Sequence, residues 1–87
     1  MATKLFNDLV FRHMVELTSS DCIFCSTQER ETGRVRLYLI FDNHGQIYSR
    51  NGLKGTWVEV KDQDEYVTVR DAYTSARHQG TVPRYSA

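Results

Sequence analysis

The residues best suited to chemistry in this sequence are its two cysteines and three histidines. Cys22 and Cys25 have the CxxC spacing seen in thiol oxidoreductases and in zinc sites. A redox cysteine begins a helix inside a βαβ unit, whereas residues 22–27 predict a short strand. In a strand, side chains at positions i and i+3 point to opposite faces, which disfavours joint binding of a metal ion. We expect both cysteines to be packing residues, with no metal site and no cofactor.

The histidines add no catalytic pattern. The spacing of His13, His44 and His78 matches no standard zinc finger or ribbon. His13 can approach Cys22 in space, but the sequence offers no oxyanion hole and no orienting group for a cysteine nucleophile. Asp21 adjoins Cys22, and its carboxylate would raise the pKa of the thiol and oppose its activation. We therefore expect no catalytic residue and no enzymatic activity.

A carboxylate cluster lies further along the chain. Asp62, Asp64 and Glu65 resemble part of a calcium loop, but the remaining ligand positions are missing. A solvated turn between two strands is the expected structure. The glycines are dispersed, so no phosphate-binding loop is predicted.

Length and charge narrow the class of protein. The chain has 87 residues, enough for one domain with one hydrophobic core. Its 11 basic and 11 acidic residues balance, which argues against a polyanion-coating protein and against an acidic DNA mimic. The longest apolar run, residues 37–41, is far shorter than the ~20 residues of a membrane-spanning helix. With no signal-peptide pattern, the sequence predicts a cytoplasmic protein with no membrane contact.

The N-terminal residues fit two kinds of element. Apolar residues within 3–18 follow one helical stripe, and Thr3 is suited to the N-cap position. Alternation in the same residues also fits a strand. Lys4, Met14 and Glu16 are good helix formers, so we expect an N-terminal helix.

Beyond residue 21 the apolar pattern alternates. Strands are predicted at residues 22–27, 34–41, 46–50, 56–61 and 66–70, followed by a short helix over residues 72–79. The sequence thus predicts one α+β domain over residues 1–80, in which the N-terminal helix packs on a curled antiparallel sheet of four or five strands. A small open barrel is the alternative arrangement. Residues 81–87 are expected to form a flexible tail.

Alternation also assigns the two faces of the predicted sheet. The expected core face carries an aliphatic set: Val35, Leu37, Leu39, Phe41, Ile47, Val58, Val60, Val67 and Val69. The opposite face gathers aromatic rings and arginines: Arg36, Tyr38, Tyr48, Arg50, Trp57, Tyr66 and Arg70. Because neighbouring strands lie ~4.8 Å apart, these side chains would form one continuous surface. This surface is the predicted binding site.

Several interpretations of that surface stay open. Tyr, Trp and Arg anchor protein interfaces, which favours association with a protein, including another copy of this chain. Aromatic rings also stack on single-stranded nucleic acid, but a chain of zero net charge lacks the basic field of such proteins. Cross-strand pairing of the rings without any ligand is a third interpretation.

From these patterns we predict a small non-enzymatic binding module that acts through the aromatic and arginine face. Association with a protein partner or with itself is the expected function. A ligand-binding protein or enzyme with its site between subunits is the alternative, because a chain this short has little core to give up to a deep pocket.

Overall fold

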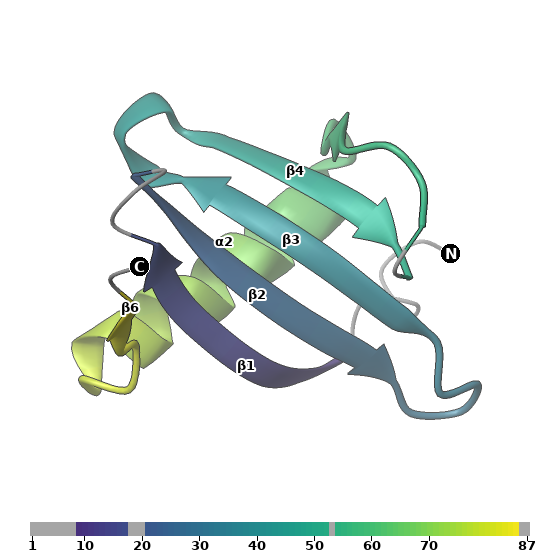
Figure 1. The fold of residues 1–87 in the computed structure, drawn as a ribbon, viewed down its shortest axis with the longest axis horizontal. Helices are drawn as coiled ribbons and strands as arrows, with labels where there is room; N and C mark the ends of the chain where they lie inside the picture. The colour runs from purple at the N-terminus through teal and green to yellow at the C-terminus, as the bar shows by residue number, and fades with distance from the viewer. Residues whose placement is uncertain (1–8, 18–20, 53, 86–87) are drawn as a thin grey trace.

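The computed structural model describes residues 9–17, 21–52 and 54–85. One sheet and one helix make up the fold (Figure 1). The elements in chain order are β1 (Leu9–Leu17), β2 (Cys22–Glu29), β3 (Val35–Phe41), the 3-10 turn η1 (Asp42–His44), β4 (Gln46–Asn51), β5 (Val58–Glu59), α2 (Gln63–His78) and β6 (Arg84–Tyr85). The sheet order is β5-β4-β3-β2-β1-β6, with antiparallel pairing from β1 to β5. The predicted α+β domain with an antiparallel sheet is confirmed.

The predicted N-terminal helix is wrong. Residues 9–17 form β1, which pairs with β2 from Leu9↔Glu29 to Leu17↔Cys22. One irregularity between Phe11 and His13 shifts the register of this pair. Both periodicities fitted these residues, and pairing along the length of a neighbouring strand outweighs the modest helix propensity of single side chains. Residues 3–8 and 18 of the predicted helix lie outside the described residues.

The predicted strand at residues 66–70 is wrong as well, because these residues are helical. One continuous helix, α2, runs from Gln63 to His78. It replaces this strand and includes residues 72–78 of the short helix expected after it. Asp62 is its N-cap, and its side chain accepts a hydrogen bond from the backbone N–H of Glu65 at 3.1 Å. The buried residues of the helix are Glu65, Val69 and Tyr73, which recur every four residues and so form one stripe.

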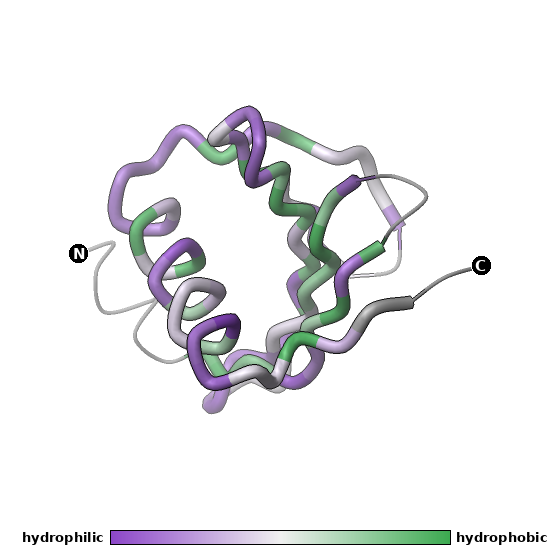
Figure 2. Tube along the Cα trace, turned by 90° about the vertical axis from the view of Figure 1, so that its left-hand side faces the viewer, coloured by the Kyte–Doolittle hydropathy of each residue, from purple (hydrophilic) through white to green (hydrophobic). Residues whose placement is uncertain are grey.

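The helix and the sheet form two layers. In Figure 1, α2 crosses behind the sheet, and Figure 2 shows the helix on one side of the sheet only. Among the described residues, no element covers the other side. The core between the layers consists of Ile23, Cys25, Tyr38, Ile40, Ile47, Val60, Val69 and Tyr73. Two layers around one core are the minimum that a stable domain needs.

The two faces of strand β3 are the opposite of the expected ones. Tyr38 and Ile40 face α2 and are 0% and 3% exposed. Their neighbours Leu39 and Phe41 must then point to the other face, because successive side chains of a strand alternate. The expected packing of Leu39 and Phe41 against a helix is therefore wrong. Val58, also expected in the core, is 61% exposed.

The C-terminal residues close the outer edge of the sheet. After α2 the chain returns to β1, where β6 pairs parallel through Glu16↔Arg84 and Leu17↔Tyr85. The backbone N–H of Glu16 also donates to the carbonyl of Pro83 at 2.9 Å. No helix within the described residues is both long enough and apolar enough to cross a membrane.

Candidate functional site

The structure divides the predicted aromatic and arginine surface among three places. Arg36 and Tyr38 lie between the sheet and α2, where they contact Glu65. Tyr66 and Arg70 lie on α2 itself. The remaining members lie together on the side of the sheet away from the helix: Tyr48, Arg50 and Trp57. The continuous surface expected from alternation is therefore not present, and each group must be considered separately.

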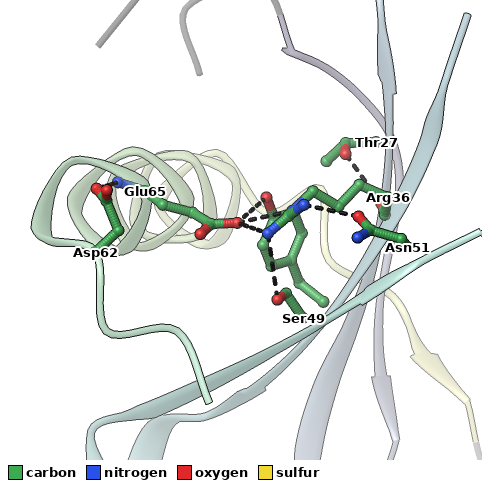
Figure 3. A network of polar contacts seen from close by, with 7 residues as sticks. Thr27, Arg36, Ser49, Asn51, Asp62 and Glu65 are labelled. Atoms are coloured by element: carbon green, nitrogen blue, oxygen red, sulfur yellow. Dashed lines mark hydrogen bonds and ion pairs between the residues drawn. The ribbon is translucent and has the colours of Figure 1, made fainter. Parts of the chain in front are cut away.

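The first group is a closed polar network around Glu65 (Figure 3). Glu65 is 5% exposed, and its Oε2 accepts hydrogen bonds from Tyr38 Oη at 2.8 Å and from Arg36 Nε at 2.7 Å. The Arg36 guanidinium also donates to Asn51 Oδ1 at 2.7 Å and to Ser49 Oγ at 3.4 Å. Burial, and then the negative charge of Glu65, raise the pKa of Tyr38. These groups satisfy one another, so the network fastens α2 to the sheet.

The second group stabilises the turn between β3 and β4. Tyr66 Oη donates to the carbonyl of Gly45 at 2.7 Å, which ties the helix to this turn. The Arg70 guanidinium lies 5.8 Å from the centre of the Tyr66 ring, close enough for a cation–π contact. Gly45 has φ +65°, a conformation that favours glycine and lets the chain reverse direction after η1.

The third group belongs to what we call the open face, the side of the sheet away from α2. Cross-strand pairs place one row of large side chains on this face, as Val15↔Phe24, Phe24↔Leu39 and Leu39↔Tyr48. A second pair, Leu37↔Arg50, lies on the same face. Apart from the buried Leu37, these side chains are half-buried, although no described element packs on them. The apolar members of the open face include Val15, Phe24, Leu37, Leu39, Phe41, Tyr48 and Trp57.

One corner of the open face is hollowed. The hollow has a volume of about 390 Å³ and is lined by Leu39, Phe41, His44, Gln46, Tyr48 and Trp57. The Phe41 and Tyr48 rings meet edge to face, 5.7 Å apart at 87°. The Arg50 guanidinium lies 5.8 Å from the centre of the Trp57 ring. Aromatic walls with a few polar groups at the rim are typical of a site that receives an apolar group.

The cysteines are buried thiols on opposite faces of β2. Burial raises the pKa of Cys25 to about 12. Burial and the carboxylate of Asp21 both raise the pKa of Cys22. A raised pKa keeps a thiol protonated, so neither sulfur is activated as a nucleophile. His13 Nδ1 lies 3.2 Å from Ser26 Oγ, and the described residues contain no group of three or more His, Cys, Asp or Glu side chains that could hold a metal ion.

A second, polar hollow lies at the end of the sheet next to the last turn of α2. Its volume is about 130 Å³, and Asp42, Tyr73 and Arg77 lie on its wall. Arg77 Nη1 donates to Asp42 Oδ2 at 2.9 Å and to Tyr73 Oη at 3.0 Å. Asn43 closes another side by donating to Asp21 Oδ2 at 2.8 Å. The charges of Asp42 and Arg77 are therefore paired with each other on this wall.

Sequence reasoning missed two features of these sites. It placed Glu65 in a solvated turn, although Asp62 followed three residues later by Glu65 is a helix-start pattern that predicts α2. It also placed Leu39 and Phe41 in the core rather than on the open face. No local signal decides that second point, since alternation gives two faces without saying which one the helix covers.

Comparison with known proteins adds no relative to this picture. No family model matches the sequence, and neither the curated proteins nor the solved structures contain a match to it. Inference about function therefore rests on the geometry of the described residues.

Proposed function

We propose that this protein is a binding module that associates with a protein partner through the open face. One observation carries the proposal: a row of large apolar side chains crosses four strands on a face that no described element covers. Apolar surface left outside a two-layer fold is stabilised when a partner removes it from water. Contiguous apolar patches of this kind mark interaction surfaces in soluble proteins.

The residue types on the open face support a protein as the partner. Tyr48, Arg50 and Trp57 belong to the residue types that contribute most to protein interfaces. The cation–π contact between Arg50 and Trp57 holds the two side chains together at the edge of the row. Such a pre-ordered anchor loses less conformational entropy on binding than two free side chains would.

Site-specific photocrosslinking tests the proposal. A photoreactive phenylalanine analogue replaces Tyr48 on the open face, and the same analogue replaces the exposed Thr74 on α2 as the matched control. After irradiation in cell extract, we expect covalent protein adducts from position 48 and few from position 74. Equal labelling at both positions, or no adduct from position 48, would contradict a protein-binding role for the open face.

The hollow at the corner of the open face favours a second candidate, a small apolar or aromatic ligand. Its volume of about 390 Å³ falls in the range of small-molecule sites, ~300–1,000 Å³. A thermal-shift screen with planar aromatic compounds tests this function. A hit counts only if Trp57→Ala abolishes the shift while Thr74→Ala keeps it, because binding elsewhere would survive both substitutions.

A further inference from the structure

We infer that the partner of the open face is a second copy of this chain, and that the two sheets pack face to face about a two-fold axis running along the strands. This inference rests on the proposed function, because it names the partner of the same surface. The resulting dimer has four layers: helix, sheet, sheet, helix.

The size of the face suits a stable dimer. The molecule measures 36 × 29 × 23 Å, and the view down its shortest axis looks onto the sheet (Figure 1). An ellipse inscribed in the two longer dimensions has an area of roughly 800 Å², so the outline of the molecule is large enough to hold the surface that each partner buries in a standard interface. A second sheet of equal size covers this area, whereas a single peptide strand would not.

The charge of the chain permits two copies to approach. The formal net charge is zero at pH 7, so one copy does not repel another over a long range. The middle of the face is uncharged, since Phe24 and Leu39 occupy the inner strands. Two sheets whose facing sides are apolar pack ~10 Å apart with their strands roughly aligned, as in β-sandwiches.

The direction of the axis follows from the unequal halves of the open face. An axis along the strands reverses the strand order, so β4 and β5 of one copy lie over β1 and β2 of the other. Val15 and Phe24 of the second copy, in the same row as Leu39, then lie over the hollow. Two hollows are filled at once, because a two-fold interface repeats every contact.

An axis across the strands is the alternative arrangement, and two features of the open face disfavour it. An axis across the strands would place each strand over the same strand of the second copy. Glu59 would then lie on the side of the second Glu59, and each hollow would lie on the side of the other hollow. Like charges and unfilled space both weaken an interface.

Light scattering coupled to size exclusion tests whether the chain forms a dimer. Over an approximately hundred-fold range of protein concentration, we expect the mass to rise toward twice the monomer mass of 10.1 kDa. Leu39→Arg places a charge in the middle of the face and should leave a monomer. Thr74→Arg adds the same charge to the exposed side of α2 and should leave the dimer intact. Circular dichroism checks that both variants are folded, and Tyr48→Lys replaces Leu39→Arg if the latter is unfolded.

A monomer at every concentration, or a dimer that survives Leu39→Arg and Tyr48→Lys, would overturn the inference. A monomeric purified protein that still forms crosslinks from position 48 to other proteins would keep the proposed function and exclude the second copy. The absence of both dimer and crosslinks would exclude the proposed function and the second copy together.

A double-mutant cycle tests the direction of the axis. In one copy, Phe24 and Trp57 lie about three strand spacings apart, roughly 14 Å, so they are too distant to couple within the chain. In the inferred dimer, Phe24 of one copy meets the hollow next to Trp57 of the other. We expect each alanine substitution to raise the dimer dissociation constant at least about tenfold, with a coupling of roughly three- to thirty-fold between them. Independent, multiplicative effects would exclude an axis along the strands.

Discussion

The two faces of the sheet distribute polarity in an unexpected way. The face covered by α2 contains an ion pair between Arg36 and the buried Glu65, whereas the face that no described element covers presents a row of aromatic and aliphatic side chains with Arg50 at its edge. The difference shows that the helix selects its face by more than apolar area. Polar groups that bond to each other between the layers hold α2 against one face of the sheet, and a row of apolar side chains stays on the other face.

Glu65 explains how the helix distinguishes the faces. Its carboxylate is buried in the helix stripe and finds its partners, Arg36 and Tyr38, on one side of β3 only. If α2 packed on the open face with Glu65 against β3, this carboxylate would lie against Leu39 and Phe41 and would lose Arg36 and Tyr38 as its donors. A buried charge without a partner costs several kcal/mol, which is a large fraction of the stability of a domain of this size.

Breaking the polar network around Glu65 should produce the largest loss of stability. Arg36→Leu leaves Glu65 buried without its cationic partner, and we expect the free energy of unfolding to fall by about 3–5 kcal/mol. Urea denaturation followed by circular dichroism measures this change, provided the variant still folds.

The matched control for that prediction removes both charges. Arg36→Leu combined with Glu65→Leu should recover most of the loss, because an apolar pair of similar size needs no hydrogen bonds. If Arg36→Leu alone costs less than ~1 kcal/mol, the network does not select the face.

Neighbouring residues of β3 compare the two faces directly. Ile40→Ala opens a cavity in the core and should cost about 2–5 kcal/mol of unfolding free energy. Leu39→Ala, on the open face, should cost about 1 kcal/mol in the monomer, since that side chain is only half-buried. Both are measured by denaturation at low protein concentration. Equal losses would mean that the open face is already covered within one chain.

Alkaline pH should lower the free energy of unfolding through two buried groups on the covered face. The pKa of Cys25 rises from 9.0 to about 12 on folding, because its thiol is buried in the core. Above pH 9 the unfolded chain loses this proton while the folded chain keeps it, so the unfolding free energy falls by about 1.4 kcal/mol per pH unit up to about pH 12. Tyr38, whose pKa is also raised by burial, adds to the fall above its ordinary value of 10.0.

Cys25→Ala identifies the contribution of this thiol. Denaturation midpoints measured at intervals from pH 8 upward should fall less steeply for the variant, although its stability at neutral pH is lower. Parallel curves for the two proteins would show that Cys25 does not titrate as its burial requires.

The smallest predicted effect concerns the start of α2. Asp62→Ala removes the acceptor for the backbone N–H of Glu65, and we expect a loss of about 1 kcal/mol. Asp62→Asn is the control, because its side-chain oxygen can still accept this bond. If Asp62→Ala costs as much as Arg36→Leu, the cap also orients Glu65 toward Arg36, and the network extends further than its direct contacts.

The sequence predicts strands β2 to β4 better than it predicts β1 or α2. Alternation over residues 35–41 and the turn at Asp42–Gly45 predict β3, β4 and the hairpin between them, all of which are present. Residues 9–17 fit both periods, and only pairing with β2 makes them a strand. Residues 63–70 contain alternating valines, but the four-residue spacing of Glu65, Val69 and Tyr73 and the cap at Asp62 indicate a helix.

Much less of the candidate site is predictable. Tyr48, Arg50 and Trp57 lie on one face as alternation predicts, yet Arg36 and Tyr38 lie on the other. Strand β3 offers a large side chain on each side at nearly every position. Choosing between the sides requires knowing that Glu65, from a helix far along the chain, packs on one of them. Tertiary packing determines this, and the local sequence does not.

The pairing of β6 with β1 has a consequence for the order of folding. Strands β2 to β5 form a meander whose contacts are local in the chain, so they can assemble early. The contact of Pro83 with Glu16 instead joins segments at opposite ends of the described chain. Closing so long a loop is entropically slow, and a nascent chain on the ribosome cannot make this contact until residue 83 has emerged. Amide exchange at Glu16 should therefore gain protection last, and it would report completion of the sheet.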